Sequence, residues 1–376
     1  MSSKILVSTR KGLFTLAPTA DPALPWHIAK VDFLGDPLNL AMRDPRDGAL
    51  YAALNLGHFG AKLRRSDDEG VTWTELAVPE FSEDCKLYAN GFAPPTDARS
   101  KERPATLMEI WSLEPGGPDE PGALWAGTIP GGLFRSDDRG ASWRLIRSLW
   151  DRPERAKWFG GGKDEAGIHS ICVDPRDSKH VSVAISCGGA WTTRDGGDTW
   201  TNVSQGMRAA YMPPELAYDL DAQDPHRMVQ CPSSPDHYWI QHHNGIFHTS
   251  NDCGVWEEST DVAPANFGFA VVVHPHDPKT AWFVPGVKDE KRIPVDAKLV
   301  VTRTSDGGQT FETLAAGLPQ DNAYDIVFRH ALAIDDTGRR LAFGSTTGGL
   351  WTTADGGEHW HALPARLPPV YAACFA

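Results

Sequence analysis

The sequence predicts an all-β protein, a seven-bladed β-propeller whose blades are four-stranded antiparallel sheets. A short motif recurs along the chain, with copies 49 to 70 residues apart. Apolar strand-like segments joined by an Asp-Pro-like turn precede the copies, and the two ends of the chain complement each other. The 376 residues are 41% hydrophobic, which is enough for a large core, and long segments with helical periodicity are absent.

The recurring motif reads Ser/Thr-x-Asp-x-Gly-x-x-Trp/Phe, and each copy should close the hairpin between the third and fourth strands of a blade. We expect the Asp to accept backbone N–H groups two residues on, the Gly to supply a positive φ, and the aromatic ring to pack back over the turn. A damaged copy covers 245–256, where Thr249 and Ser250 are both candidates for the first residue. The regular copies begin at Ser66, Ser136, Thr193, Thr304 and Thr353.

Each repeat supplies two apolar strands, a third strand with a Gly-Leu-Phe/Trp signature and a fourth that begins at the motif's aromatic residue. Residues 11–31 have the later part of this pattern without a first strand, whereas VYAACF at 370–375 matches a first strand. We therefore expect the C-terminal strand to join the N-terminal blade and close the ring, which removes an open edge. The chain is then one domain, with blades at 370–376 plus 4–31, 32–81, 82–148, 149–203, 204–260, 261–315 and 316–369.

The motif resembles the Asp box of sialidases and related BNR-repeat propellers, including proteins described as glycosyl hydrolase BNR-repeat proteins. This resemblance covers nearly the whole chain. It implies a propeller, a hydrolase of glycosidase type, and a structural role for the boxes away from the active site. Sialidases have six blades and a Phe/Tyr-Arg-Ile-Pro motif near the start. Here seven units are expected and Arg-Ile-Pro falls at 292–294, so the resemblance does not extend to sialidase activity.

Charge and composition exclude several classes of partner. The formal net charge is -13 and no basic stripe is present, which argues against nucleic acid. No run of 18 apolar residues exists, so no membrane span is expected. The first residues lack the apolar core of a signal peptide, and the six cysteines form no CxxC pairs. We therefore expect a cytoplasmic protein with reduced thiols.

The candidate site lies on the face opposite the motif turns. Loops that enter the first strands, and loops that join second to third strands, open on this face and carry the insertions. Aligning the first strands on their Asp-Pro turns places Glu109, His169 and His330 at equivalent positions near the strand starts. Buried polar groups need partners, so we expect a polar, His-rich funnel there. The insertions are 82–106, 149–168, 204–227 and 286–298.

Candidate site residues are assigned on this basis. The expected catalytic residues are Glu109, His169, His243 and His330. The expected substrate-binding residues are Arg10, Asn39, His58, Glu215, His242, Arg292 and Tyr371. The four catalytic candidates are also the expected ligands of one divalent metal ion, since imidazole and carboxylate groups suit such ions. Metal-free acid–base chemistry and a hydrogen-bonded plug without chemistry remain alternatives.

The expected function is a hydrolase or lyase that binds a small polar molecule, a sugar or an organic acid, in the funnel. The alternative is a non-catalytic interaction or assembly propeller whose long loops dock a protein partner, because a fold does not determine a function. Under this alternative the contact residues would be Tyr88, Phe92, Trp150, Trp158 and Tyr211.

Overall fold

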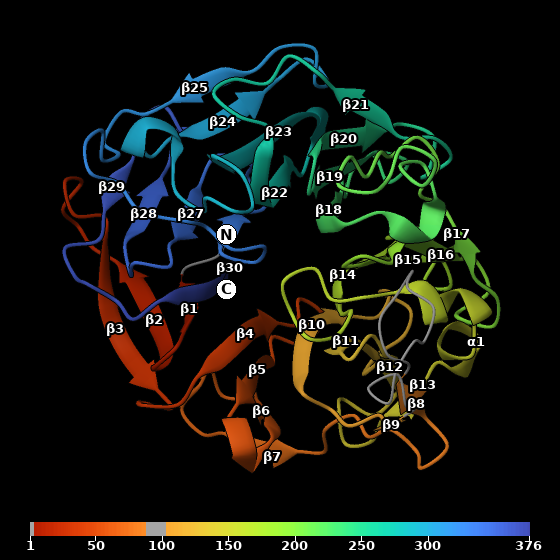
Figure 1. Cartoon of the computed structure of the whole chain (residues 1–376). Helices are drawn as coiled ribbons and strands as arrows, with labels where there is room; N and C mark the ends of the chain where they lie inside the picture. The colour runs from red at the N-terminus through yellow and green to blue at the C-terminus, as the bar shows by residue number, and fades with distance from the viewer. Residues whose placement is uncertain (1–3, 88–102) are drawn as a thin grey trace.

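The structure is a computed structural model, which describes residues 4–87 and 103–376. Seven four-stranded antiparallel sheets stand around a central axis as the blades of a propeller (Figure 1). The fold class predicted from the sequence is thereby confirmed. Within the described ranges, no helix combines the length and the apolar character needed to cross a bilayer.

In the first four blades the strands run in the following order from the axis outward. The N-terminal blade contains β30 (Val370–Phe375), β1 (Ile5–Thr9), β2 (Gly12–Pro18) and β3 (Trp26–Asp32). The second contains β4 (Leu38–Arg43), β5 (Leu50–Asn55), β6 (Ala61–Ser66) and β7 (Thr74–Leu76). The third contains β10 (Glu109–Pro115), β11 (Leu124–Ile129), β12 (Leu133–Ser136) and β13 (Arg144–Leu145). The fourth contains β14 (Ile168–Val173), β15 (Val181–Ile185), β16 (Gly189–Thr193) and β17 (Thr201–Asn202).

The remaining three blades follow the same order. The fifth contains β18 (Pro225–Gln230), β19 (Tyr238–His242), β20 (Gly245–Thr249) and β21 (Glu257–Ser259). The sixth contains β22 (Phe267–His274), β23 (Asp277–Gly286), β24 (Val301–Thr304) and β25 (Glu312–Leu314). The seventh contains β26 (Leu332–Ile334), β27 (Leu341–Gly344), β28 (Leu350–Thr353) and β29 (His361–Ala362).

Short elements decorate the insertions. Strands β8 (Lys86–Leu87) and β9 (Arg103–Pro104) form a separate two-stranded ribbon. The described helices are α1 (Arg147–Trp150), η1 (Gly57–Phe59), η3 (Pro153–Lys157), η4 (Leu220–Ala222) and η5 (Val295–Ala297).

The last strand closes the ring, as predicted. Strand β30 pairs antiparallel with β1, with Ile5 opposite Phe375, and becomes the innermost strand of the N-terminal blade. It also contacts the seventh blade, because Ala373 donates its N–H to the carbonyl oxygen of His330 at 2.8 Å. Strand β30 therefore pairs with the rest of the first blade and joins that blade to the last.

The middle strands are buried on both faces because each blade is packed between two others. All residues of β11, β15 and β19 are buried, which explains their nearly continuous apolar sequences. Large rings fill the spaces between blades. Trp282 of the sixth blade, for example, lies in one core cluster with Leu341 and Phe343 of the seventh. This packing gives the inner strands a rigid support.

The recurring motif forms a hydrogen-bonded turn. Ser66 Oγ lies 2.7 Å from Asp68 Oδ1 and accepts the N–H of Gly70 at 2.8 Å. Asp68 accepts the N–H of Thr72 at 2.8 Å. This donor lies four residues after the Asp, not two residues after it as the sequence predicts. The bonds from Thr72, followed by the bond from Ser66, lower the pKa of Asp68 to about 2.

The damaged copy begins at Thr249, and Asn251 takes the place of the Asp. The hydroxyl of Thr249 lies 2.6 Å from Asn251 Oδ1, which accepts the N–H of Val255 at 3.1 Å. An amide oxygen thus reproduces part of the bonding of the carboxylate. These turns follow the third strands, so they lie on one face of the ring, and the innermost strands begin on the opposite face.

Candidate functional site

Most innermost strands carry an irregularity near their start. In the second blade the pairing passes from Leu38 with Leu54 directly to Leu40 with Ala53, which leaves Asn39 without a partner. Such a bulge turns a side chain out of the regular alternation and is frequent beside functional sites. The inner-strand residues left out in this way are Asn39, Trp111, His169, His226, the pair Phe269–Ala270 and Tyr371.

These registers correct two of the sequence alignments. Glu109 is the first residue of β10, and the residue equivalent to His169 is Trp111, two positions later. In the fifth blade, where the alignment by turns gives Val229 or Gln230, the equivalent residue is His226. The inner strands have no strict apolar–polar alternation that an inserted residue would shift, so the alignment by turns could not locate the bulges.

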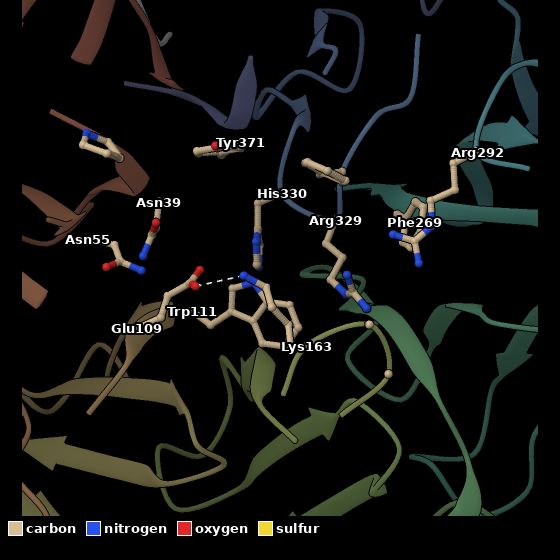
Figure 2. A pocket seen from close by; sticks show the side chains of 14 residues that line it. Asn39, Asn55, Glu109, Trp111, Lys163, Phe269, Arg292, Arg329, His330 and Tyr371 are labelled. Carbon is tan, nitrogen blue, oxygen red and sulfur yellow. Dashed lines mark hydrogen bonds and ion pairs between the residues drawn. The ribbon is translucent and has the colours of Figure 1, made fainter. Parts of the chain in front are cut away.

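A cavity of about 400 Å³, here called the funnel, opens on the face opposite the motif turns. Its wall combines the starts of inner strands with residues of the loops at 161–163 and 286–298. Figure 2 shows Asn39 and Asn55 on one side, Phe269 and Arg292 on the other, and His330 between them. The lining residues are Pro37, Asn39, Asn55, Glu109, Trp111, Gly161, Gly162, Lys163, Phe269, Arg292, Phe328, Arg329, His330 and Tyr371.

Arg329 places a shielded positive charge in the funnel wall. Its guanidinium carbon lies 4.8 Å from the ring centre of Trp111 and 5.3 Å from that of Phe269, so both rings flank the charge. Its Nε and Nη2 atoms are inaccessible to solvent and have no hydrogen-bond partner among the described residues. Burial lowers the pKa of Arg329 to about 10, so the group stays protonated at neutral pH. Buried N–H groups without a hydrogen-bond partner are costly for a folded protein.

Two further cations line the funnel, and each has a carboxylate partner. Lys163 Nζ lies 3.1 Å from Glu109 Oε2. Arg292 Nε lies 3.0 Å from Asp289 Oδ1, and the Arg292 guanidinium lies 5.2 Å from the ring centre of Phe269. Among the described lining residues there are thus three cations and one carboxylate, Glu109. The funnel is positive although the chain as a whole carries a formal charge of -13.

His330 forms the floor of the funnel and also lines a second cavity, of about 310 Å³, farther along the axis. Its Nε2–H donates to the carbonyl oxygen of His169 at 2.7 Å. Burial, together with the charge of Arg227, lowers the pKa of His330 to about 3, so the ring is neutral at neutral pH. His330 therefore has the bonding expected of a plug, and its Nδ1 can accept a hydrogen bond.

The predicted residues divide into two groups by position. Glu109, Asn39, Arg292, His330 and Tyr371 line the funnel. The others do not line it, for reasons that differ from residue to residue. His169 is buried behind the wall, edge-on to Trp111. The exposed side chains outside the lining are Arg10, His58 and Glu215. His242 and His243 turn toward Asp224 instead.

Asp224 is the centre of a buried polar cluster beside the funnel. His226 Nε2 lies 3.5 Å and His243 Nδ1 3.3 Å from Asp224 Oδ2. His242 Nε2 accepts the N–H of Asp224 at 3.0 Å. Although burial favours the neutral acid, His226, His243 and Arg329 hold the pKa of Asp224 well below its usual range. The structure thus places His243 with Asp224 and His226, not with Glu109, His169 and His330 as the predicted ligand set required.

The aromatic residues expected to contact a protein partner are mostly covered. Trp150 is 3% and Trp158 7% exposed, and both pack inside the protein. Tyr211 is partly exposed, and its hydroxyl donates to the carbonyl oxygen of Ala222. The other two, Tyr88 and Phe92, lie outside the described residues. Packing of the loops against the protein therefore accounts for both tryptophans.

Sequence reasoning did not select four residues that matter here: Arg329, Trp111, Asp224 and His226. Arg329 directly precedes His330 in a segment that reads as a strand, and an arginine in an apolar strand is a usable signal. Asp224 directly precedes Pro225 at the start of β18. Its proximity to His243 depends on the pairing of β18 with β19, which only the fold establishes.

No family model matches the chain. A curated protein described as a probable oligoxyloglucan-reducing end-specific xyloglucanase, from Neosartorya fischeri, is 29% identical over 107 residues. That stretch is 28% of this chain and 12% of the fungal protein. The match is therefore local and does not establish a family.

Solved structures are similar over much greater lengths. The GH74 xyloglucanase from Xanthomonas campestris has a TM-score of 0.63 and 19% identity, covering 100% of this chain and 52% of that one. The GH74 enzyme of Niastella koreensis has a TM-score of 0.54 and 14% identity, covering 99% and 66%. YCF48 bound to the D1 peptide has a TM-score of 0.50 and 13% identity, covering 87% and 81%. This chain spans about half the length of the Xanthomonas enzyme, and these likenesses show the propeller fold alone.

Proposed function

We propose that this chain is an enzyme, a hydrolase or lyase, whose funnel binds a small polar molecule that carries a carboxylate, such as an organic acid or an acidic sugar. The observation that carries the proposal is Arg329 in the funnel wall, a cation with no ion-pair partner among the described residues. A carboxylate in the funnel can accept a charge-assisted hydrogen bond from a guanidinium N–H that reaches the cavity.

The rest of the wall suits a polar ring or chain. Asn39, Asn55 and Tyr371 offer amide and hydroxyl groups that can bond to the hydroxyls of a ligand. Trp111 and Phe269 offer aromatic surface on which an apolar ring face can stack. The volume of about 400 Å³ fits a ligand of small-molecule size. These features support a sugar acid at least as well as a simple organic acid.

The proposed chemistry centres on Glu109. The likeness to xyloglucanases supports a hydrolase that acts on carbohydrate, but glycosidases generally use two carboxylates. Glu109 is the one carboxylate among the described lining residues, so the funnel meets that requirement only in part. A lyase reaction needs one base and a group that stabilises the charge formed beside a carboxylate, which Glu109 and Arg329 can supply.

In the lyase form of the proposal, Glu109 removes the proton from the carbon next to the ligand carboxylate. The electron pair of that C–H bond forms a carbon–carbon double bond, and the bond from the neighbouring carbon to its oxygen substituent breaks. The leaving oxygen takes a proton from Lys163 or water. Arg329 stabilises the negative charge that the carboxylate gains during proton removal.

Ligand titration tests this proposal. Glucuronate and galacturonate should bind, whereas glucose and galactose, which lack the carboxylate, should not. Loss of a hydrogen-bonded charge pair costs about 1.5–3 kcal/mol, so Arg329→Gln should weaken binding of the acids by about 10- to 100-fold. Isothermal titration calorimetry measures both effects.

Arg303→Gln is the matched control, because Arg303 lies on β24 and pairs with Glu312 and Glu358 away from the funnel. Its affinity for the acids should equal that of the unchanged protein. Equal affinity for acidic and neutral sugars, or full affinity in Arg329→Gln, would contradict the proposal. Incubation with an oligomeric uronate then distinguishes the reactions, since elimination produces an absorbing double bond and hydrolysis does not.

A further inference from the structure

In the cluster around Asp224, a ring nitrogen of His226 faces a carboxylate oxygen of Asp224. His226 is 1% exposed, and its Nδ1–H donates to the carbonyl oxygen of Gly268 at 2.6 Å. Because a carbonyl oxygen only accepts, the proton of a neutral His226 is on Nδ1. Its Nε2 then presents a lone pair to Asp224 Oδ2, 3.5 Å away, inside the protein.

A cation between these atoms would remove the conflict, and the spacing fits a metal ion. The three potential ligand atoms of Asp224, His226 and His243 all lie within 4.8 Å of one another. Asp224 Oδ2 is 3.5 Å from His226 Nε2 and 3.3 Å from His243 Nδ1. Zinc bonds of about 2.0–2.2 Å in a tetrahedron put neighbouring ligand atoms about 3.3–3.6 Å apart.

The surroundings hold each side chain in place, as partners of metal ligands do. A metal-bound histidine usually donates its other N–H to a carbonyl or carboxylate, which His226 does through Gly268. The second oxygen of Asp224 accepts the N–H of Cys187 at 3.2 Å. The ring of Phe269 stacks on His226 with centres 4.6 Å apart, and Tyr211 meets His243 edge-on at 5.0 Å.

The cluster adjoins the funnel. Phe269, which stacks on His226, is also a funnel-lining residue. Gly161 lines the funnel as well, and a Cβ atom there would come within 2.9 Å of Asp224 Oδ2. A glycine is therefore needed for the loop to approach the carboxylate this closely. One wall of the funnel thus separates the bound ligand of the proposed function from the cluster.

We propose that Asp224, His226 and His243 bind one divalent transition metal ion, with zinc as the best fit, in the wall of the funnel. Two imidazoles and one carboxylate form a ligand set that suits zinc, and three protein ligands leave a fourth position for water or another group. This inference does not depend on the proposed function, because it concerns residues outside the funnel lining.

Zinc titration of the whole chain tests the proposal. The purified protein is stripped with a chelator and titrated with zinc against a chromophoric indicator. One zinc ion per chain is expected, and His243→Ala should lower the affinity by about 100-fold or more, since loss of an outer partner alone costs 10- to 100-fold. His243 is the most accessible of the three ligands, so its removal is the change least expected to prevent folding.

His359→Ala is the matched control, because His359 also lies beside a carboxylate, Asp355 at 3.2 Å, but is exposed on a motif turn. It should keep one zinc ion per chain. Cobalt added to the unchanged protein should give the intense visible absorption of a tetrahedral site, a readout that needs no variant. Absence of stoichiometric zinc binding, or full affinity in His243→Ala, would overturn the proposal.

The two proposals can fail separately. Arg329→Gln should still bind zinc, and His243→Ala should still bind the sugar acids. Zinc should also raise the thermal midpoint of the unchanged protein, and should not do so for His243→Ala, because a ligand stabilises only the state that binds it. If the unchanged protein binds zinc but does not bind the sugar acids, the proposed function is refuted and the zinc site is not.

Discussion

At the scale of single residues, Arg329 shows a conflict between stability and binding. The rings of Trp111 and Phe269 flank its guanidinium, and cation–π contacts are each worth about 0.5–2 kcal/mol. Two of its nitrogen atoms nevertheless have no hydrogen-bond partner among the described residues, which costs about 1–3 kcal/mol per group. A ligand carboxylate in the funnel would give this cation the ion pair that the described residues do not supply.

Arg329→Met should therefore leave the ligand-free protein as stable as before, or stabilise it by up to about 2 kcal/mol. The apolar side chain keeps the contacts with both rings and removes the shielded charge. Urea unfolding measures the change in the free energy of unfolding. In contrast, Arg303→Met should destabilise by about 1 kcal/mol, because Arg303 bonds to Glu312 and Glu358. Destabilisation by Arg329→Met of more than about 1 kcal/mol would show that the guanidinium is satisfied.

The same scale shows what sequence could predict about the site. Asn39, His330 and Tyr371 were placed in the funnel because they are polar or amphipathic residues at strand starts, and they line it. His243 was placed there too, yet it lies beside Asp224. The difference is physical. The strand pattern determines which face a residue occupies. The contact between His243 and Asp224 depends instead on the pairing of β18 with β19, because Asp224 directly precedes β18 and His243 directly follows β19.

At the scale of elements, the motif turns lie on one face of the ring and the bulges of the inner strands lie near the opposite face. Each motif turn is held by hydrogen bonds within one short segment. The residues that form it are therefore close together in the sequence, and the motif is easy to recognise. A bulge depends on the register between two strands, and it is hidden here because the inner strands have no strict apolar–polar alternation. This is why the turns and the blade order followed from the sequence, while Trp111 and His226 did not.

The motif turns should each contribute measurably to stability. Ser136 is 1% exposed, and its Oγ accepts the N–H of Gly140 at 2.8 Å. Ser136→Ala leaves that N–H without a partner, so the free energy of unfolding should fall by about 1–3 kcal/mol. Ser142→Ala in the same turn removes an exposed hydroxyl and should change the free energy of unfolding by less than about 0.5 kcal/mol. Urea unfolding of both variants gives the comparison, and equal effects would contradict this account of the turn.

At the scale of the whole molecule, an acidic protein surrounds a positive funnel. Three cations and one carboxylate are among the described lining residues, against a formal net charge of -13 for the chain. A cleft of one sign with low-dielectric walls concentrates the field and attracts ions of the opposite sign. The balance of charge in the sequence argues against nucleic-acid partners, but it could not reveal this local inversion, because cations from several segments meet only in the ring.

Ring closure gives a prediction at the same scale. A chain that ends at Pro369 lacks β30 and leaves the inner edge of β1 unpaired. It also loses the burial of Val370, Ala372 and Ala373, so the free energy of unfolding should fall by at least about 3 kcal/mol. The affinity for the sugar acids should fall as well, because Tyr371 of β30 lines the funnel. A synthetic peptide of residues 370–376 should restore part of both properties, and unchanged stability of the shortened chain would contradict the role given to β30.

The position of β30 has a consequence for how the protein is made. On the ribosome, six blades and three quarters of the first emerge before the segment that completes the innermost edge. Until Tyr371 and its neighbours leave the exit tunnel, the nascent chain is an open arc and part of the funnel wall is missing. A chain whose translation stops early would therefore expose a pairing edge and lack a complete binding site, which makes it a ready substrate for chaperones and proteases.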